Sequence, residues 1–421
     1  MDIKSGNMLD ESVASSQEAI TLEDQYGAHN YHPLPVVLCR GEGVYLWDVE
    51  GKRYYDFLSA YSAVNQGHCH PRIINALITQ AKQLTLTSRA FYNDKLGLAE
   101  KYICETFGYQ KSLFMNSGAE AVETGMKLAR RWGYEKKGIP DNQAVLVFAT
   151  GNFHGRTTSI ISASTDPDAR RGFGPYLPGI EIVAYDDKEA LASALSNPNA
   201  CGLVVEPIQG EAGVFVPQEG YLKTARELCT QNNVLLILDE IQTGLARTGR
   251  MLASEYEDVR ADILLLGKAL SGGVMPVSCV LADDDIMLVI RPGEHGSTFG
   301  GNPLAAAVAI EALQVLKDEG LAEHAYRLGM DFRERMAELV HKAPLLKLVR
   351  GKGLLNALVI NDSPESDTAW NVCVKLMEQG LLAKPTHGNI IRLAPPLVIT
   401  EEQLHECCDI ISTVILNYQH P

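Results

Sequence analysis

Short apolar runs alternate with helical periodicity along the middle of the chain. Six such runs follow one another from about residue 111, at residues 113–115, 144–149, 180–184, 203–205, 234–238 and 263–266. Segments that fit helices lie between them, for example residues 117–135 and 220–232. Runs that are apolar throughout are typical of strands buried on both faces, as in a parallel sheet covered by helices. The pattern therefore predicts a βαβ succession with right-handed crossovers.

A seventh apolar run, at residues 277–282, follows the sixth too closely for a helical crossover. A parallel connection needs about a dozen residues or more. We therefore expect this strand to be antiparallel to its neighbours. The predicted fold class is α/β, with a mostly parallel seven-stranded sheet that contains one antiparallel strand.

The pattern changes after about residue 300. Long helices are predicted at residues 302–319 and 321–342, and shorter helices and strands follow, with strands near 345–350, 354–360 and 389–394 and helices near 368–379 and 400–417. This indicates a smaller α+β domain. We divide the chain into an N-terminal segment that packs with the small domain (1–60), a large domain (61–300) and a small C-terminal domain (301–421). The first 25 or so residues are polar, and we expect the start of this segment to be mobile.

Composition narrows the class of protein. The 421 residues are 46% hydrophobic and 21% charged, as in an ordinary globular protein of about two domains. A net charge of −15 argues against nucleic acid or an anionic membrane as a partner. No apolar stretch approaches the roughly 20 residues that span a bilayer. The acidic start is neither a signal peptide nor a presequence, so we expect a cytoplasmic protein, or one of the mitochondrial matrix if a presequence has been removed.

Metal binding is not indicated. The nine cysteines are scattered and form no C-x-x-C pair. The run His68-Cys69-His70 has no second ligand cluster nearby in the sequence, so a metal site there is a weak hypothesis. We expect no metal.

Two of the apolar runs are followed by a charged residue. Asp239 follows the run at 234–238, and Lys268 comes after Gly267 and the run at 263–266. Ligands of open parallel sheets bind outside the carboxyl ends of the strands. A lysine that can form a Schiff base and an acid that can pair with a pyridinium nitrogen are what pyridoxal 5′-phosphate (PLP) requires of a protein. Taken alone, a lysine such as Lys268 is more often a surface residue, and Asp239 could be a helix N-cap.

Further residues fit the same cofactor. Ser117, with Glu120 three residues later, forms a capping-box pattern after a strand, and the free N–H groups of such a helix start can hold a phosphate. Gln242, three residues after Asp239, can contact the ring hydroxyl. Phe153 can stack on the ring, and Arg156 can hold a carboxylate by a bidentate pair. Each of these is a weak signal alone.

These pieces, in this order, resemble the class III (ω-amino acid) PLP-dependent aminotransferases of fold type I. The resemblance covers nearly the whole chain from about residue 25 and is most specific at residues 234–249 and 266–273. It implies that Lys268 is the Schiff-base lysine and Asp239 the partner of the pyridinium nitrogen. Ser117, Gly118 and Ala119 are then expected to bind the phosphate. Thr298 is expected to reach the phosphate of the neighbouring subunit in a homodimer whose active sites lie at the interface.

The resemblance also implies a substrate. It predicts transfer of the δ-amino group of L-ornithine to 2-oxoglutarate, with Tyr31 and Arg156 holding the carboxylate far from the reacting amine. Glu211 and Arg392 are expected to form a switchable pair, with Tyr61 beside them. His154 departs from some members of the family, which carry Trp there.

Other functions stay open at this point. The nearest is a class III enzyme that acts on N-acetylornithine or γ-aminobutyrate, against which Tyr31 and Tyr61 argue. A PLP-dependent mutase or lyase would not need the Glu211/Arg392 pair, and a non-catalytic protein would not need Lys268. A dinucleotide-binding protein is disfavoured because no G-x-G-x-x-G follows a first strand.

Overall fold

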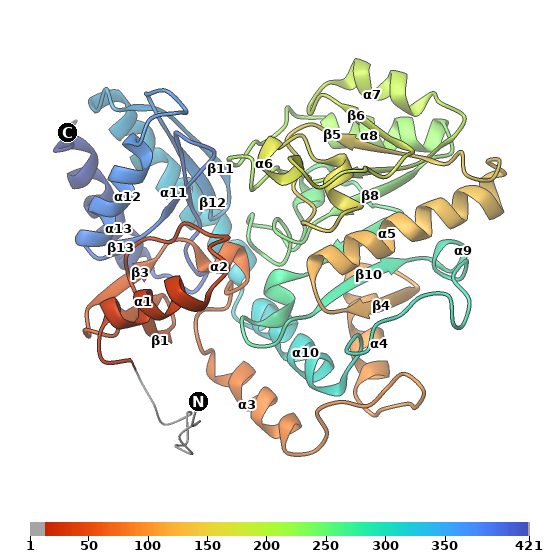
Figure 1. The fold of residues 1–421 in the computed structure, drawn as a ribbon, viewed down its shortest axis with the longest axis horizontal. Helices are drawn as coiled ribbons and strands as arrows, with labels where there is room; N and C mark the ends of the chain where they lie inside the picture. The colour runs from red at the N-terminus through yellow and green to blue at the C-terminus, as the bar shows by residue number, and fades with distance from the viewer. Residues whose placement is uncertain (1–12, 420–421) are drawn as a thin grey trace.

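A seven-stranded sheet forms the centre of the computed structural model, which describes residues 13–419 (Figure 1). Its strands are arranged in the order β4-β10-β9-β8-β7-β5-β6. Their bounds are β4 Lys111–Met115, β5 Val145–Ala149, β6 Ile180–Val183, β7 Ala200–Val205, β8 Leu235–Asp239, β9 Ile263–Leu266 and β10 Ser278–Ala282. Strands β5 to β9 pair in parallel, while β10 is antiparallel to both β9 and β4. The predicted fold class, including its one antiparallel strand, is confirmed.

Helices cover both faces of this sheet. Alternate residues of β8 belong to different cores: Ile237 packs with the residues of α5 (Gly118–Trp132), whereas Leu236 packs with those of α8 (Tyr221–Gln231). Successive side chains of a strand point to opposite faces, so an unbroken apolar run is what a doubly covered strand needs. The connecting and flanking helices are α3 Pro71–Ala81, α4 Leu96–Phe107, α6 Pro167–Arg170, α7 Lys188–Leu195 and α9 Asp284–Met287.

The C-terminal part contains a second sheet, with strand order β11-β12-β15-β14. Its elements are α10 Pro303–Asp318, α11 Leu321–Lys342, β11 Leu346–Lys352, β12 Leu355–Ile360, α12 Thr368–Glu378, β13 Leu381–Leu382, β14 Lys384–Thr386, β15 Ile390–Leu393 and α13 Glu401–Leu416. The elements predicted beyond residue 300 are all found. Strands β13 and β14 were not predicted, because two or three residues, one of them a proline, give no readable alternation.

The polar N-terminal segment contains a helix, α1 (Ser16–Tyr26), which begins with Ser15 as its N-cap. The Ser16 hydroxyl donates a hydrogen bond to Glu50 at 2.7 Å, which ties the helix to the following strands. Residues 1–12 lie outside the described part of the chain, as do residues 420–421.

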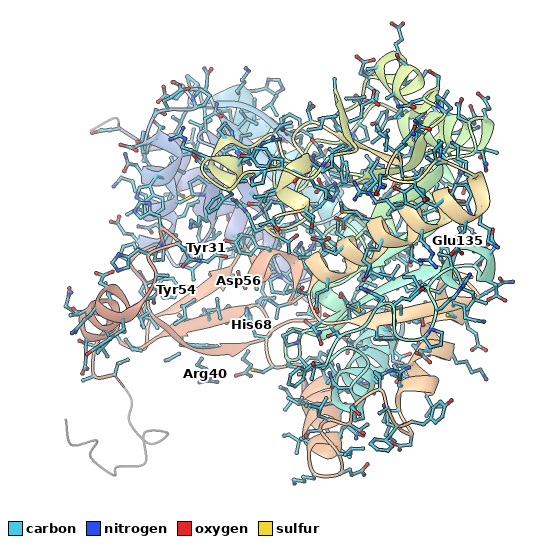
Figure 2. The ribbon with its side chains drawn as sticks, turned by 45° about the vertical axis from the view of Figure 1, so that its right-hand side comes forward. Tyr31, Arg40, Tyr54, Asp56, His68 and Glu135 are labelled. Carbon is cyan, nitrogen blue, oxygen red and sulfur yellow. The ribbon has the colours of Figure 1, made fainter. Side chains whose placement is uncertain are left out.

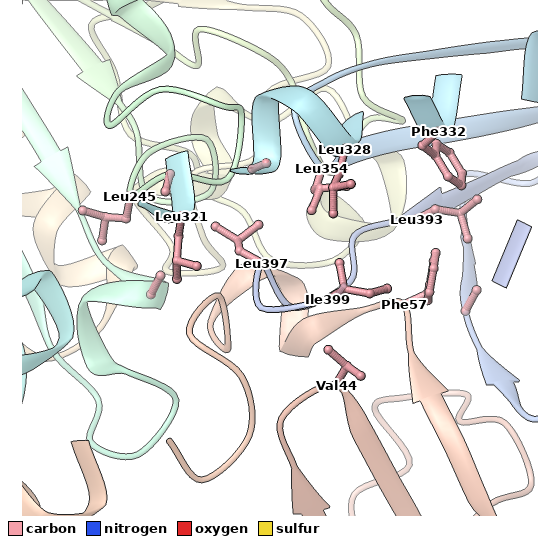
Figure 3. Close-up of a cluster of buried hydrophobic side chains, with 14 of the residues drawn as sticks. Val44, Phe57, Leu245, Leu321, Leu328, Phe332, Leu354, Leu393, Leu397 and Ile399 are labelled. Atoms are coloured by element: carbon pink, nitrogen blue, oxygen red, sulfur yellow. The ribbon is translucent and has the colours of Figure 1, made fainter. Parts of the chain in front are cut away.

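Three N-terminal strands, β1 Leu38–Glu42, β2 Tyr45–Asp48 and β3 Arg53–Asp56, form a third sheet. Its fourth strand is β13, which pairs in parallel with β3. One hydrophobic core beside this sheet contains buried side chains from many segments between residues 44 and 415. Phe57, Leu245 and Leu397 are among them (Figure 3). This pairing supports the predicted association of the N-terminal segment with the small domain, whose boundaries stay predictions.

No helix between residues 13 and 419 combines the length and the apolar character needed to cross a membrane.

The two histidines of the His68-Cys69-His70 run have different hydrogen-bond partners. His68 Nε2 lies 2.7 Å from Asp56, and His70 Nε2 lies 2.9 Å from Glu319.

Candidate active site

The charged residues that follow β8 and β9 meet at one edge of the central sheet. The two strands pair in parallel, so Asp239 at the end of β8 and Lys268 just beyond β9 lie at the same, carboxyl edge. Both line a cavity of about 200 Å³, together with Gly118, Ala119, Phe153, His154, Gly155, Glu206, Ile241 and Gln242. Residues at or after the ends of five strands, β4, β5, β7, β8 and β9, therefore converge on one space.

Asp239 is buried and held in place by two donors. Its Oδ2 accepts a hydrogen bond from His154 Nδ1 at 2.7 Å, and its Oδ1 accepts one from the Ile241 N–H at 3.1 Å. Burial alone would lower the pKa of His154, but the hydrogen bond and the charge of Asp239 outweigh it and leave the pKa raised. Each carboxylate oxygen has a second lone pair, so Asp239 can still accept from a ligand.

Lys268 lies within the first turn after β9 and is half-buried. Burial lowers the pKa of its amine, against the opposing charges of Asp239 and Glu211. A lowered pKa increases the fraction of neutral amine, the form that attacks a carbonyl carbon. The environment therefore suits a nucleophilic lysine.

Glu206 is a site residue that sequence reasoning did not single out. It follows β7, is 6% exposed and accepts a hydrogen bond from the Phe153 N–H at 3.0 Å. Burial raises its pKa to about 7. The available signal was its place after a buried strand, as for Asp239.

The start of α5 is open to a phosphate. Ser117 caps the helix in a capping box with Glu120, as the pattern predicted. Gly118 and Ala119 line the 200 Å³ cavity with the next N–H groups of the helix. The helix has 15 residues, so its N-terminal dipole adds to the attraction for an anion.

A larger cavity of about 560 Å³ adjoins the first and shares Phe153, His154 and Gly155 with it. The predicted substrate residues line it: Tyr31, Tyr61, Arg156, Glu211 and Arg392. Tyr31 is 71% exposed, at the outer side, whereas Arg392 is 2% exposed. The Arg156 guanidinium lies 5.5 Å from the centre of the Phe153 ring. Arg156 is thus exposed near the mouth of the cavity, and Arg392 is the cation at its buried end.

The inner cation is paired. Arg392 Nη1 donates to Glu211 Oε2 at 2.6 Å, and the guanidinium lies 5.0 Å from the centre of the Tyr61 ring. Burial would raise the pKa of Glu211, but the charge of Arg392 lowers it overall, so the pair is ionic. Arg392 Nε is buried and has no hydrogen-bond partner within residues 13–419. The guanidinium therefore keeps a donor for a further carboxylate.

Gln242 borders both parts of the site. Its Oε1 lies 3.5 Å from Arg392 Nη1 and occupies the space that a Cβ at residue 210 would take, only 1.8 Å away. Glycine at 210 is needed for this approach.

The structure does not bring Thr298 to these cavities among the described residues. It lies exposed on the loop before α10, next to Ser297, whose hydroxyl accepts a hydrogen bond from Asn116. Its expected role toward a neighbouring subunit stays a prediction.

The group of residues matches the chemistry of PLP. PLP carries an aldehyde, a ring nitrogen and a phosphate. The cavity offers an amine of lowered pKa, a buried carboxylate fixed by His154, and a helix N-terminus. The donor set therefore fits the cofactor that the sequence implied.

Comparison with known proteins also indicates a PLP-dependent family. Residues 26–415 match the family described as aminotransferase class-III. The mitochondrial ornithine aminotransferase of Drosophila ananassae is 60% identical over 402 residues, covering 96% of this chain and 92% of that protein. The ornithine aminotransferase of Toxoplasma gondii, a structure with partial occupancy of PLP, is 50% identical with a TM-score of 0.94, covering 96% and 95% of the two chains. An acetylornithine aminotransferase from Elizabethkingia anophelis is 58% identical with a TM-score of 0.89, covering 96% and 100%. The chain therefore belongs to the class III aminotransferases, a PLP-dependent family.

Proposed function

We propose that this protein is an ornithine δ-aminotransferase. It moves the δ-amino group of L-ornithine to 2-oxoglutarate, giving glutamate and glutamate-5-semialdehyde, which cyclises to pyrroline-5-carboxylate with loss of water. The observation that carries the proposal is the Glu211–Arg392 ion pair beside Tyr61, in the cavity that adjoins Lys268. Relatives named ornithine aminotransferase, at up to 60% identity, support the same substrate.

The ion pair allows one site to accept two unlike substrates. Ornithine brings a δ-carbon without a carboxylate, whereas glutamate brings an α-carbon that carries one. A free buried guanidinium would be left unpaired by the first substrate and would favour binding through the α-end. Glu211 neutralises Arg392 in the ornithine half-reaction and gives way to the substrate carboxylate in the other. Arg156, near the mouth, serves the distal carboxylate of both substrates.

The residues divide the chemistry between them. Bound PLP supplies an electron sink for the carbon that carries the reacting amine. Asp239, fixed by His154, would hold a proton at the ring nitrogen, while Ser117, Gly118 and Ala119 would hold the phosphate. Lys268, as a neutral amine, would take the proton from the δ-carbon of ornithine as general base. Phe153 would pack on the ring, and Gln242 would contact its hydroxyl.

The active unit is a homodimer in this proposal. Thr298 is exposed, as expected of a residue that completes the phosphate site of the neighbouring subunit. The matching relatives include proteins named mitochondrial, which supports the matrix as the location if a presequence is removed, with the cytoplasm as the alternative.

A substrate panel tests the proposal. L-Ornithine, N-acetylornithine and γ-aminobutyrate are each supplied with 2-oxoglutarate, and kcat/KM is measured for each. The proposal predicts that ornithine is used at least about tenfold better than either rival. Preference for N-acetylornithine, the substrate named for one 58% identical relative, would keep the chemistry and overturn the substrate.

A further inference from the structure

Tyr61 lies in an unusual turn of the backbone. Residues 59, 60, 61 and 62 all have positive φ, at 49°, 45°, 60° and 73°, and none of them is glycine. This is one turn of left-handed helix, a conformation that residues with a Cβ adopt singly and rarely in succession. Something in the surrounding structure must hold it.

The carboxylate of Asp56 makes the contacts that hold the start of this turn. Its Oδ1 accepts hydrogen bonds from the Leu58 and Ser59 N–H groups, both at 2.8 Å. Its Oδ2 accepts one from His68 Nε2 at 2.7 Å (Figure 2). Asp56 ends strand β3 and is 4% exposed, so these bonds are shielded from water.

His68 in turn is fixed to the N-terminal sheet. Its N–H donates to the Gly43 carbonyl at 2.8 Å, and its carbonyl accepts from the Gly43 N–H at 3.0 Å. The imidazole also lies against Gly41, where a Cβ would come within 3.0 Å of the ring. The Asp56 carboxylate is therefore held from the side opposite the turn.

The turn is tied to the strand that carries Arg392 as well. The Ala394 N–H donates to the Phe57 carbonyl at 2.8 Å, two residues beyond Arg392. The Tyr61 ring, at the other end of this short segment, lies 5.0 Å from the Arg392 guanidinium. The left-handed turn thus sets where the phenol ring stands relative to the ion pair.

We propose that Asp56 is a positioning residue for substrate selection, which acts with His68 by holding the left-handed turn that presents Tyr61 to the substrate cavity. The inference rests on the proposed function, because it takes ornithine as the substrate and gives Tyr61, beside the Glu211–Arg392 pair, the role of excluding other amines. Without the Asp56 carboxylate the turn relaxes toward ordinary backbone angles, and the ring leaves its place beside Arg392. The volume that the ring vacates then admits γ-aminobutyrate.

The test is a double-mutant cycle on selectivity. The ratio of kcat/KM for L-ornithine to that for γ-aminobutyrate is measured for the PLP-loaded wild type, Asp56→Ala, Tyr61→Ile and the double variant. We expect Asp56→Ala to lower the selectivity ratio roughly tenfold when Tyr61 is present. In the Tyr61→Ile background, Asp56→Ala should leave the ratio unchanged.

Asp48→Ala is the matched control. Asp48 ends strand β2 of the same sheet, is 7% exposed, and accepts hydrogen bonds from the Lys52 N–H and the Tyr54 hydroxyl, both at 2.7 Å. It caps a hairpin away from the cavity, so its removal should lower stability and leave the selectivity ratio unchanged. A ratio that falls equally in Asp48→Ala and Asp56→Ala would mean general loosening and would overturn the inference.

Three other outcomes are decisive. An unchanged ratio in Asp56→Ala, or an equal fall with and without Tyr61, removes the positioning role and leaves the proposed function intact. A wild type that does not use ornithine removes both. If Asp56→Ala does not fold, Asp56→Asn replaces it: the amide keeps an oxygen for the backbone and loses the second acceptor, so we expect a fall of about threefold, and no fall contradicts the proposal.

Discussion

At the scale of single residues, burial and local charge act in opposite directions on the groups that line the cofactor cavity. Burial prevails at Lys268, whose pKa is lowered, and at Glu206, whose pKa is raised. The partner prevails at His154 and Glu211, because each lies within hydrogen-bond distance of an opposite charge. The result is an amine of lowered pKa beside a carboxylate that His154 holds in place, which suits the chemistry.

Removal of the Glu211 carboxylate should free Arg392. We expect Glu211→Ala to raise kcat/KM for glutamate as amine donor roughly tenfold and to lower it for ornithine, because the guanidinium then pairs with any α-carboxylate. Stopped-flow measurement of each half-reaction separates the two effects. Glu211→Gln, which keeps the size and loses the charge, should behave alike; unaltered glutamate kinetics in both variants would remove the switch.

Glu206 should make stability depend on pH. Its native pKa of about 7 lies above the ordinary value of 4.5, so the folded state holds the proton more tightly than the unfolded state. The resulting stability is present below about pH 4.5 and is lost as pH rises through 7. Compared with Glu206→Gln, the cofactor-free wild type should lose up to about 3 kcal/mol across this window. Urea unfolding at pH 5 and pH 8 measures this loss of stability. The same change in unfolding free energy for both proteins would contradict the raised pKa of Glu206.

At the scale of elements, the sequence predicts some helices and strands well and gives no indication of others. Strands β5 to β10 were predicted because doubly buried strands leave unbroken apolar runs, and the capping box of α5 because its residues are adjacent in the chain. The left-handed turn at 59–62 left no signal, since none of its residues is glycine and the holding contacts come from His68 and Asp56. The contacts of Glu206 and His154 were not predicted for a related reason: their partners lie far away in the sequence.

The turn also makes a prediction about stability. For a residue with a Cβ, the left-handed backbone conformation costs about 1–2 kcal/mol, and glycine does not have this cost. Ala60→Gly should therefore stabilise the protein by up to about 1 kcal/mol, after the greater freedom of glycine in the unfolded chain is subtracted. Ala337→Gly, in the middle of helix α11, should instead destabilise it by about 1 kcal/mol. Denaturant midpoints of the two variants check this, and destabilisation by Ala60→Gly would contradict the observed backbone angles.

At the scale of the whole molecule, one buried cation joins three distant parts of the chain. Arg247 donates to the side-chain oxygen of Asn65 and to the carbonyls of Leu354 and Pro395. It is fully buried, and burial lowers its pKa to about 9. The sequence showed the motif that contains Arg247 but gave no sign of this role, because all three partners lie far away in the sequence and two of them are backbone carbonyls, which any residue type provides.

Loss of Arg247 should loosen these parts together. We expect Arg247→Ala to destabilise the protein by about 3 kcal/mol, because buried acceptors lose a charged donor. Arg226→Ala, which removes a half-exposed pair with Asp262, should cost no more than about 1 kcal/mol. Urea unfolding of the two variants compares them, and equal losses would show that the buried bonds contribute little.

The central claim is that Lys268 and the Glu211–Arg392 pair make this protein act on the δ-amine of ornithine. The most direct test is one half-reaction: the PLP-loaded protein is mixed with L-ornithine without an oxo-acid, the visible absorbance of the cofactor is followed, and pyrroline-5-carboxylate is trapped. We predict loss of the absorbance with one equivalent of trapped product per site. Loss of absorbance with N-acetylornithine or γ-aminobutyrate but not with ornithine, or no cofactor absorbance after addition of PLP, would contradict the account.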